Sequence, residues 1–176
     1  MNYKSIEVEV LTPAVGALIR GIDISRPLDP TIITEIESAF HEHLVIFFEQ
    51  QKLNPVQLVK FARQFGNIGT YPFVQGMKSH PEVVEVVKNK DERINFGGLW
   101  HTDTSYLLRP PASSVLYAVD VPSIGGDTLF ANMYLAYESL SEKFKKLISN
   151  LSVINSAEKP DAAVTRVHRI AEKPRD

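Results

Sequence analysis

Residues 95–141 read NFGGLWHTDTSYLLRPPASSVLYAVDVPSIGGDTLFANMYLAYESLS, and they hold the most distinctive chemistry of the chain. Trp100 and Tyr106 flank a histidine and an aspartate that are separated by one residue. In an extended segment, side chains two positions apart point to the same side. His101 and Asp103 can therefore offer an imidazole nitrogen and a carboxylate oxygen to one ion.

This pair of ligands suits non-haem iron. Two histidines and one carboxylate bind Fe(II) on one face and leave three positions open for other ligands. A second histidine from a distant strand would complete the set. The spacing alone leaves an alternative open, because His-x-Asp arises often by chance and such a histidine is commonly a surface or core residue. The surrounding sequence has to decide.

Composition indicates an ordinary soluble globular protein of one-domain size. The 176 residues are 44% apolar and 23% charged, with a formal net charge of -2 and no long run of one sign, so neither nucleic-acid binding nor membrane binding is expected. There is no cysteine, so a metal must be held by His, Asp or Glu. The N-terminus lacks the apolar stretch of a signal peptide, which makes a cytoplasmic location the expectation.

Local signals predict four helices and five strands. Two helix starts place a capping residue before a proline, at Asp29 with Pro30 and at Asn54 with Pro55, and Ser139 with Glu142 fits a capping box. The helices are expected at residues 30–43, 55–65, 132–140 and 142–151. Apolar alternation and β-branched runs predict strands at residues 6–11, 45–48, 83–87, 113–119 and 127–130.

Four blocks of the chain resemble the taurine dioxygenase family of Fe(II)- and 2-oxoglutarate-dependent dioxygenases in order and spacing. They are LTPAVGALIRGIDISRPLD (residues 11–29), EHLVIFFEQQKLNPVQLVKFARQFGNIG (42–69), the VVEVV segment (83–87) and residues 95–141. The combination of WHTDTSY, a proline pair and GGDTLFAN is the most specific part. The resemblance extends to about Leu151 and corresponds to the N-terminal portion of the family.

The resemblance implies a mainly β fold with flanking helices, namely a double-stranded β-helix or jelly roll that is incomplete at the C-terminus. Residues 1–176 would form a single dioxygenase-like domain without the C-terminal part of the family fold. Without the resemblance, strands and helices that alternate in this way could equally form a mixed α/β sheet.

The resemblance also implies roles for individual residues. His101 and Asp103 match the first two iron ligands, and Thr128 in GGDT matches the threonine that helps hold a carboxylate of the cosubstrate 2-oxoglutarate. Substrate contacts are implied at Tyr71, Phe73 and Asn95. The loop that follows residue 69 lacks the histidine-rich character of the taurine-specific enzymes, which argues against taurine itself.

The distal iron ligand has no clear match. His168 is the only histidine downstream of the pair, and it lies in a charged stretch without the family motif, so it is expected to be a solvated loop residue. Two ligands bind Fe(II) poorly, and the 176-residue chain alone is expected to be weakly active or inactive. Strand edges left unpaired favour association, which leaves a homo-oligomer open.

The implied function is oxidation of a small acidic organic substrate, a sulfonate, sulfate ester or carboxylate, with Fe(II), 2-oxoglutarate and O2. One alternative is a non-catalytic, family-like binding or scaffold protein, which the unmatched third ligand favours. A hydrolase that uses the pair on zinc is a weaker alternative, since no third ligand or water-activating Glu stands nearby.

Overall fold

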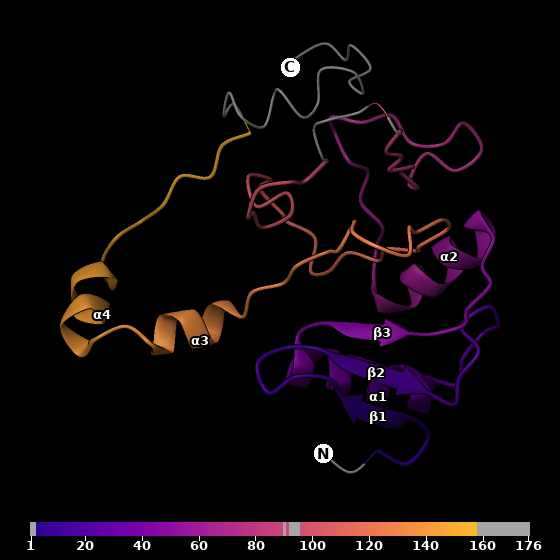
Figure 1. Cartoon of the computed structure of the whole chain (residues 1–176), viewed down its shortest axis with the longest axis horizontal. Coiled ribbons are helices and arrows are strands. Elements are labelled where there is room, and N and C mark those ends of the chain that lie inside the picture. The colour runs from indigo at the N-terminus through magenta and orange to yellow at the C-terminus, as the bar shows by residue number, and fades with distance from the viewer. Residues whose placement is uncertain (1–2, 90, 92–95, 158–176) are drawn as a thin grey trace. The chain divides into compact units, whose positions relative to one another are not determined.

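The computed structural model of the chain describes residues 3–89, 91 and 96–157. They form two compact units. Figure 1 labels the helices and strands and colours the chain by residue number. The first unit consists of residues 3–65 and 117–152, and the second of the described residues between 66 and 116 together with 153–157. All the helices and strands of the described chain belong to the first unit.

A three-stranded sheet with the order β1-β2-β3 forms the base of the first unit. Strands β1 (Glu7–Val10) and β2 (Ala17–Arg20) are antiparallel, whereas β2 and β3 (Ile46–Phe48) are parallel. The central strand β2 is buried at three of its four positions. A parallel pair requires a long crossover connection, and here a helix provides it.

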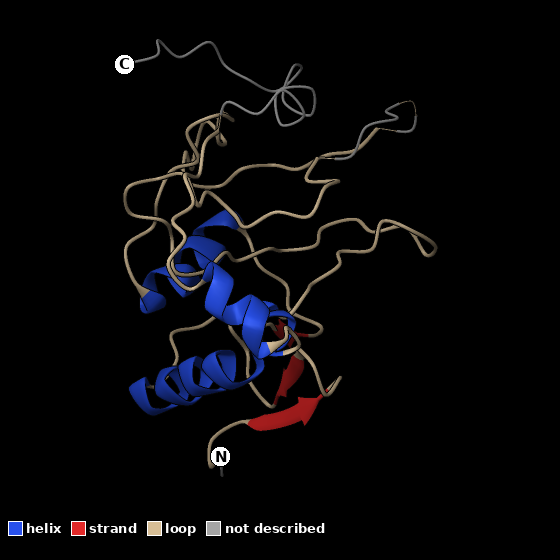
Figure 2. Cartoon of the chain, turned by 90° about the vertical axis from the view of Figure 1, so that its left-hand side faces the viewer, coloured by secondary structure: helices blue, strands red, loops and turns tan. Residues whose placement is uncertain are grey.

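That crossover is α1 (Pro30–His43), which packs against the sheet (Figure 2). Its first turn is closed by the carboxylate of Asp29, which accepts a hydrogen bond from the Thr31 amide at 2.9 Å. The buried residues of the shared core come from the helix, from β2 and from the residue before β1. They are Ile6, Ile19, Ile36 and Ala39.

The second helix, α2 (Pro55–Ala62), continues into a 3-10 turn, η1 (Arg63–Phe65). Asn54 and Gln57 form a complete capping box at its start. The ring of Phe61 lies edge-on to Phe48 and Phe65, with ring centroids 5.5 and 5.1 Å apart. The predictions of helices at 30–43 and 55–65 are confirmed.

Helices α3 (Met133–Glu138) and α4 (Glu142–Ile148) confirm the last two predicted helices over shorter ranges. The capping box predicted for Ser139 is wrong. Ser139 ends α3, and Ser141 caps α4 by accepting a hydrogen bond from the Phe144 amide. Neither helix contains a buried residue.

Three predicted strands are wrong. Residues 83–87, 113–119 and 127–130 have irregular backbone, while β2, which the sequence did not reveal, is formed. A strand needs a neighbouring strand to pair with, and no strand pairs with these segments among the residues described. Their apolar side chains are correspondingly exposed, for example Leu116 at 74% and Val119 at 86%.

The described residues form a small sheet with a few helices, and they do not show a complete jelly roll. The mainly β character expected from the resemblance is not found in them, because more of these residues are helical than extended. Within the described ranges, no helix is both long and apolar enough to cross a membrane.

Candidate metal centre

His101 and Asp103 face each other within the second unit. The distance between His101 Nε2 and Asp103 Oδ1 is 3.1 Å. Neither residue lies in a strand, because residues 103–106 form a turn that is closed by a hydrogen bond from the Leu107 amide to the Thr104 carbonyl. The expected extended segment is therefore wrong in detail, and a turn brings the two side chains together.

The hydrogen bond at Nδ1 of the imidazole makes Nε2 an acceptor that faces the Asp103 carboxylate. His101 Nδ1 lies 2.7 Å from the carbonyl oxygen of Leu99, which can only accept, so Nδ1 carries the proton. In the neutral imidazole, Nε2 is then an acceptor that faces a second acceptor, the carboxylate of Asp103. Two acceptors at 3.1 Å require either a second proton or a metal cation between them.

The outer oxygen of the carboxylate is also held. The hydroxyl of Ser114 donates a hydrogen bond of 2.8 Å to Asp103 Oδ2. Nε2 and Oδ1 are thus the two atoms available to a metal ion. The other polar atom of each side chain, Nδ1 or Oδ2, is held by a hydrogen bond within the chain. This is the arrangement in which metal ligands are found, since their outer atoms are usually tied to backbone or side-chain groups.

Gly97, four residues before His101, leaves room for the imidazole ring. Its backbone has a φ of +69°, and a Cβ added there would lie 3.3 Å from His101 Cε1. Glycine satisfies both conditions at once, because it adopts positive φ without strain and leaves room for the ring.

The turn after the carboxylate is strained. Thr104 has a φ of +45°, which is rare for a β-branched residue, and such strain costs about 1–3 kcal/mol. Its buried hydroxyl has no hydrogen-bond partner among the residues that the structure describes. Strained backbone concentrates at functional sites, where the surrounding structure holds it in place.

The geometry fits a divalent metal ion. Cis ligands on an octahedral ion, with bonds of about 2.1 Å, lie about 3.0 Å apart, which is close to the 3.1 Å observed between Nε2 and Oδ1. Both side chains remain accessible, with exposed fractions of 51% for His101 and 56% for Asp103. Within residues 3–89, 91 and 96–157, no third His, Asp or Glu joins them.

An aromatic cluster belongs to the same unit. The ring of Phe73 lies 5.5 Å from that of Tyr106, which follows the ligand pair, and 6.1 Å from that of Tyr71. Tyr71 and Phe73 also line a hollow of about 470 Å³. Its other lining residues are Thr70, Pro72, Val74, Gln75, Gly76, Met77, Lys78 and Pro81.

The other predicted site residues lie either in the first unit or outside the described residues. Thr128 belongs to the first unit, where it is exposed on irregular backbone, so its contact with 2-oxoglutarate stays a prediction. Asn95 and His168 lie outside the described residues. Ser114, Gly97 and the Leu99 carbonyl were missed, because the sequence shows no spacing signal for contacts made through a turn.

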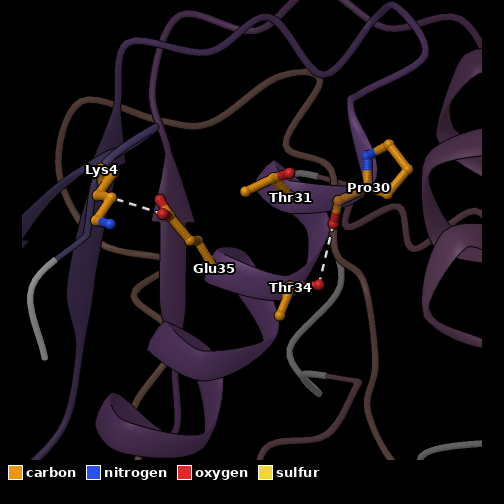
Figure 3. A pocket seen from close by; sticks show the side chains of 5 residues that line it. All are labelled: Lys4, Pro30, Thr31, Thr34 and Glu35. Carbon is orange, nitrogen blue, oxygen red and sulfur yellow. Dashed lines mark hydrogen bonds between the residues drawn. The ribbon is translucent and has the colours of Figure 1, made fainter.

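A second hollow, of about 540 Å³, lies at the start of α1 in the first unit (Figure 3). Its polar groups already bind one another. The carboxylate of Glu35 accepts from the Lys4 amide at 3.0 Å, and the Thr34 hydroxyl donates to the Pro30 carbonyl. The Lys4 and Ser5 amides also lower the pKa of Glu35. These contacts serve to fasten α1 to the N-terminal segment.

Comparison with known proteins finds a family match over nearly the whole chain. Residues 7–175 match the family model for the taurine catabolism dioxygenase TauD, TfdA family. An alkylsulfatase from Acinetobacter baylyi is 35% identical over 156 residues, which are 88% of this chain and 48% of that protein. An alpha-ketoglutarate-dependent sulfate ester dioxygenase from Pseudomonas putida is 30% identical over 93% of this chain and 56% of its own length.

Solved structures give the same result. The crystal structure of a taurine dioxygenase from Burkholderia xenovorans is similar with a TM-score of 0.70 and 36% identity, over 84% of this chain and 52% of that one. The chain spans about half the length of the curated relatives it matches. With a family match over nearly all its residues, the chain belongs to the taurine catabolism dioxygenase TauD, TfdA family.

Proposed function

We propose that this chain carries the first part of the iron site of a 2-oxoglutarate-dependent dioxygenase that oxidises a small organic anion. The supporting observation is the 3.1 Å approach of His101 Nε2 to Asp103 Oδ1, with the outer atom of each side chain held by a hydrogen bond. A surface ion pair would not require both outer atoms to be fixed. Family membership supports Fe(II) as the ion that such a pair would bind.

The residues of this chain would bind and orient the reactants. His101 and Asp103 would hold Fe(II), and the Thr128 hydroxyl would orient a carboxylate of 2-oxoglutarate. With both bound, the site would supply oxidation of a substrate C–H bond by O2, coupled to decarboxylation of 2-oxoglutarate to succinate and CO2. The protein contributes positioning and exclusion of water, and the cofactor contributes the redox chemistry.

The hollow beside the aromatic cluster supports the substrate class. Tyr71 and Phe73 give it an apolar wall, and Lys78 adds a positive charge to its lining. An organic chain or ring that carries one acidic group matches this combination. We therefore propose a sulfate ester, sulfonate or carboxylate as substrate, with Asn95 as a further contact. The name of the Pseudomonas putida relative supports the sulfate ester.

The third ligand is proposed to come from outside the described residues, from either this polypeptide or another copy.

A specific observation favours a second candidate function. No third acidic or histidine side chain joins the pair in the part of the chain that is described. A non-catalytic protein that binds a small acid on the family scaffold would also have this feature.

Turnover separates these functions. The chain is incubated with Fe(II), 2-oxoglutarate and a panel of sulfate esters, sulfonates and carboxylates, and succinate is measured with and without O2. Slow, O2-dependent succinate formation that Asp103→Ala abolishes is expected. Equal rates in the chain and in Asp103→Ala would contradict the dioxygenase and favour the binding protein. Loading with zinc in place of iron tests for hydrolysis.

A further inference from the structure

The carboxylate of Asp103 has one oxygen engaged by its own chain. The hydroxyl of Ser114, eleven residues further along, donates a hydrogen bond of 2.8 Å to Asp103 Oδ2. The other oxygen, Oδ1, faces His101 Nε2. Both residues belong to the second unit, so the contact lies within one compact part of the chain.

A hydrogen bond to one oxygen restricts how the carboxylate can bind a metal. A free carboxylate can rotate about its terminal torsion, which has a broad and roughly two-fold energy profile. It can then bind through either oxygen or through both. The Ser114 hydroxyl reduces this freedom because it holds Oδ2, so that Oδ1, which faces His101, is the oxygen presented to the ion.

The histidine is restricted in the same way. The Leu99 carbonyl accepts the Nδ1 proton, which fixes the tautomer with a lone pair on Nε2. Ser114 on the carboxylate and Leu99 on the imidazole therefore act as a matched pair of supports. Groups that support metal ligands in this way contribute about 10- to 100-fold to metal affinity or activity.

We propose that Ser114 is a positioning residue of the metal site, which holds Asp103 for binding through Oδ1 alone. This inference rests on the proposed function, because it requires a metal ion at the pair. Ser113 provides a matched control. It is a neighbouring exposed serine of the same irregular segment, and among the described residues it is Ser114, not Ser113, that donates a hydrogen bond to Asp103.

The test measures Mn(II) binding to the whole chain by the loss of the free-ion EPR signal, in the wild type, Ser114→Ala, Ser114→Thr and Ser113→Ala. Ser114→Ala is expected to weaken Mn(II) binding by about 10-fold or more and to change the line shape of the bound ion. Ser114→Thr keeps the hydroxyl and restores both. Ser113→Ala resembles the wild type.

Equal affinities for Ser114→Ala and Ser113→Ala would overturn the inference, and so would failure of Ser114→Thr to recover binding that Ser114→Ala loses. Far-UV circular dichroism identifies any variant that fails to fold, and the Thr variant still decides the question in that case. A further variant, His101→Ala, separates failure of the proposed function from failure of the Ser114 inference. If His101→Ala binds Mn(II) as well as the wild type does, the proposed function fails together with the inference. If only Ser114 proves irrelevant, the inference alone fails.

Discussion

The sheet-and-helix layer of residues 3–65 and the site segment of residues 96–116 are ordered by different forces. In the layer, Ile36 on α1 is 1% exposed and Ile19 on β2 is 2% exposed, so apolar burial holds the elements together. In the site segment, Leu108 is 99% exposed and Trp100 70% exposed. Its order comes from a turn, a few side-chain hydrogen bonds and the ring contact between Tyr106 and Phe73.

Within residues 96–116, which carry the ligand pair, no apolar side chain is fully buried, whereas the layer has a core of its own. A supporting scaffold can be self-sufficient because its sheet, crossover helix and core lie close together in sequence. The site segment places two ligands by polar contacts, which are directional and individually weak. Changes in the layer should therefore act on stability, and changes in the segment should act on metal binding.

The largest effect is expected in the core of the layer. Ile36→Ala removes a fully buried side chain and should lower the free energy of unfolding by about 2–5 kcal/mol. The matched change in the site segment, Leu108→Ala, should alter it by less than about 0.5 kcal/mol, because that side chain is exposed. Urea denaturation measures both. Similar losses in the two variants would show that the segment has a core after all.

A pair of glycines distinguishes strain from metal-site geometry. Gly97 and Gly21 both have positive φ, +69° and +79°, but only a side chain at Gly97 would meet the His101 ring. Each change to alanine should cost about 1 kcal/mol or more of stability. Only Gly97→Ala should also weaken Mn(II) binding, which EPR titration measures. Equal Mn(II) affinities for the two variants would argue against support of the ring by Gly97.

A smaller effect is expected at the start of α2. Asn54→Ala removes the side chain that accepts a hydrogen bond from the Gln57 amide, and an N-cap of this kind contributes about 1 kcal/mol. The loss should appear in urea denaturation without a change in Mn(II) affinity. Asn54→Ser keeps an N-cap acceptor and serves as the control. A stability loss in the serine variant as large as in the alanine variant would contradict the capping explanation.

The smallest effect is a pH dependence in the layer. Burial, together with the hydrogen bond that its hydroxyl donates to Glu42, raises the pKa of Tyr3 to about 12. A group whose pKa is raised on folding stabilises the protein below its unfolded value, and this contribution is lost as pH rises through the folded value. The unfolding temperature should therefore fall between pH 10 and 12.

Tyr3→Phe is the control for this pH dependence. It lacks the titrating hydroxyl, so its unfolding temperature should fall less steeply over the same interval. An identical slope in the wild type and in Tyr3→Phe would show that other groups cause the alkaline loss.

Local signals in the sequence predicted the helices well. The start of α1 at Pro30 and that of α2 at Pro55 follow from a cap and a proline that are adjacent in sequence. Strands could not be predicted equally well, because pairing depends on a partner elsewhere in the chain. The apolar run at 113–119 has strand character but no paired neighbour in the described chain, and β2 gained two neighbours without a clear alternating signal.

In the candidate site, too, local features could be predicted and contacts between distant residues could not. The spacing of His101 and Asp103 identified the pair, and the resemblance supplied the ion. The support from Ser114 could not be predicted, because its hydroxyl and the Asp103 carboxylate are eleven positions apart along a backbone without helix or strand. No periodicity describes such a path, so only the folded turn reveals it.

The central claim is that His101 and Asp103 bind the same divalent ion. Nuclear magnetic resonance of the chain with 15N-labelled histidine tests it most directly, since added Mn(II) broadens only the rings that it approaches. The account predicts that His101, identified by its loss in His101→Ala, broadens first among the five histidines and that Asp103→Ala removes this selectivity. Earlier broadening of another histidine, or unchanged broadening of His101 in Asp103→Ala, would contradict it.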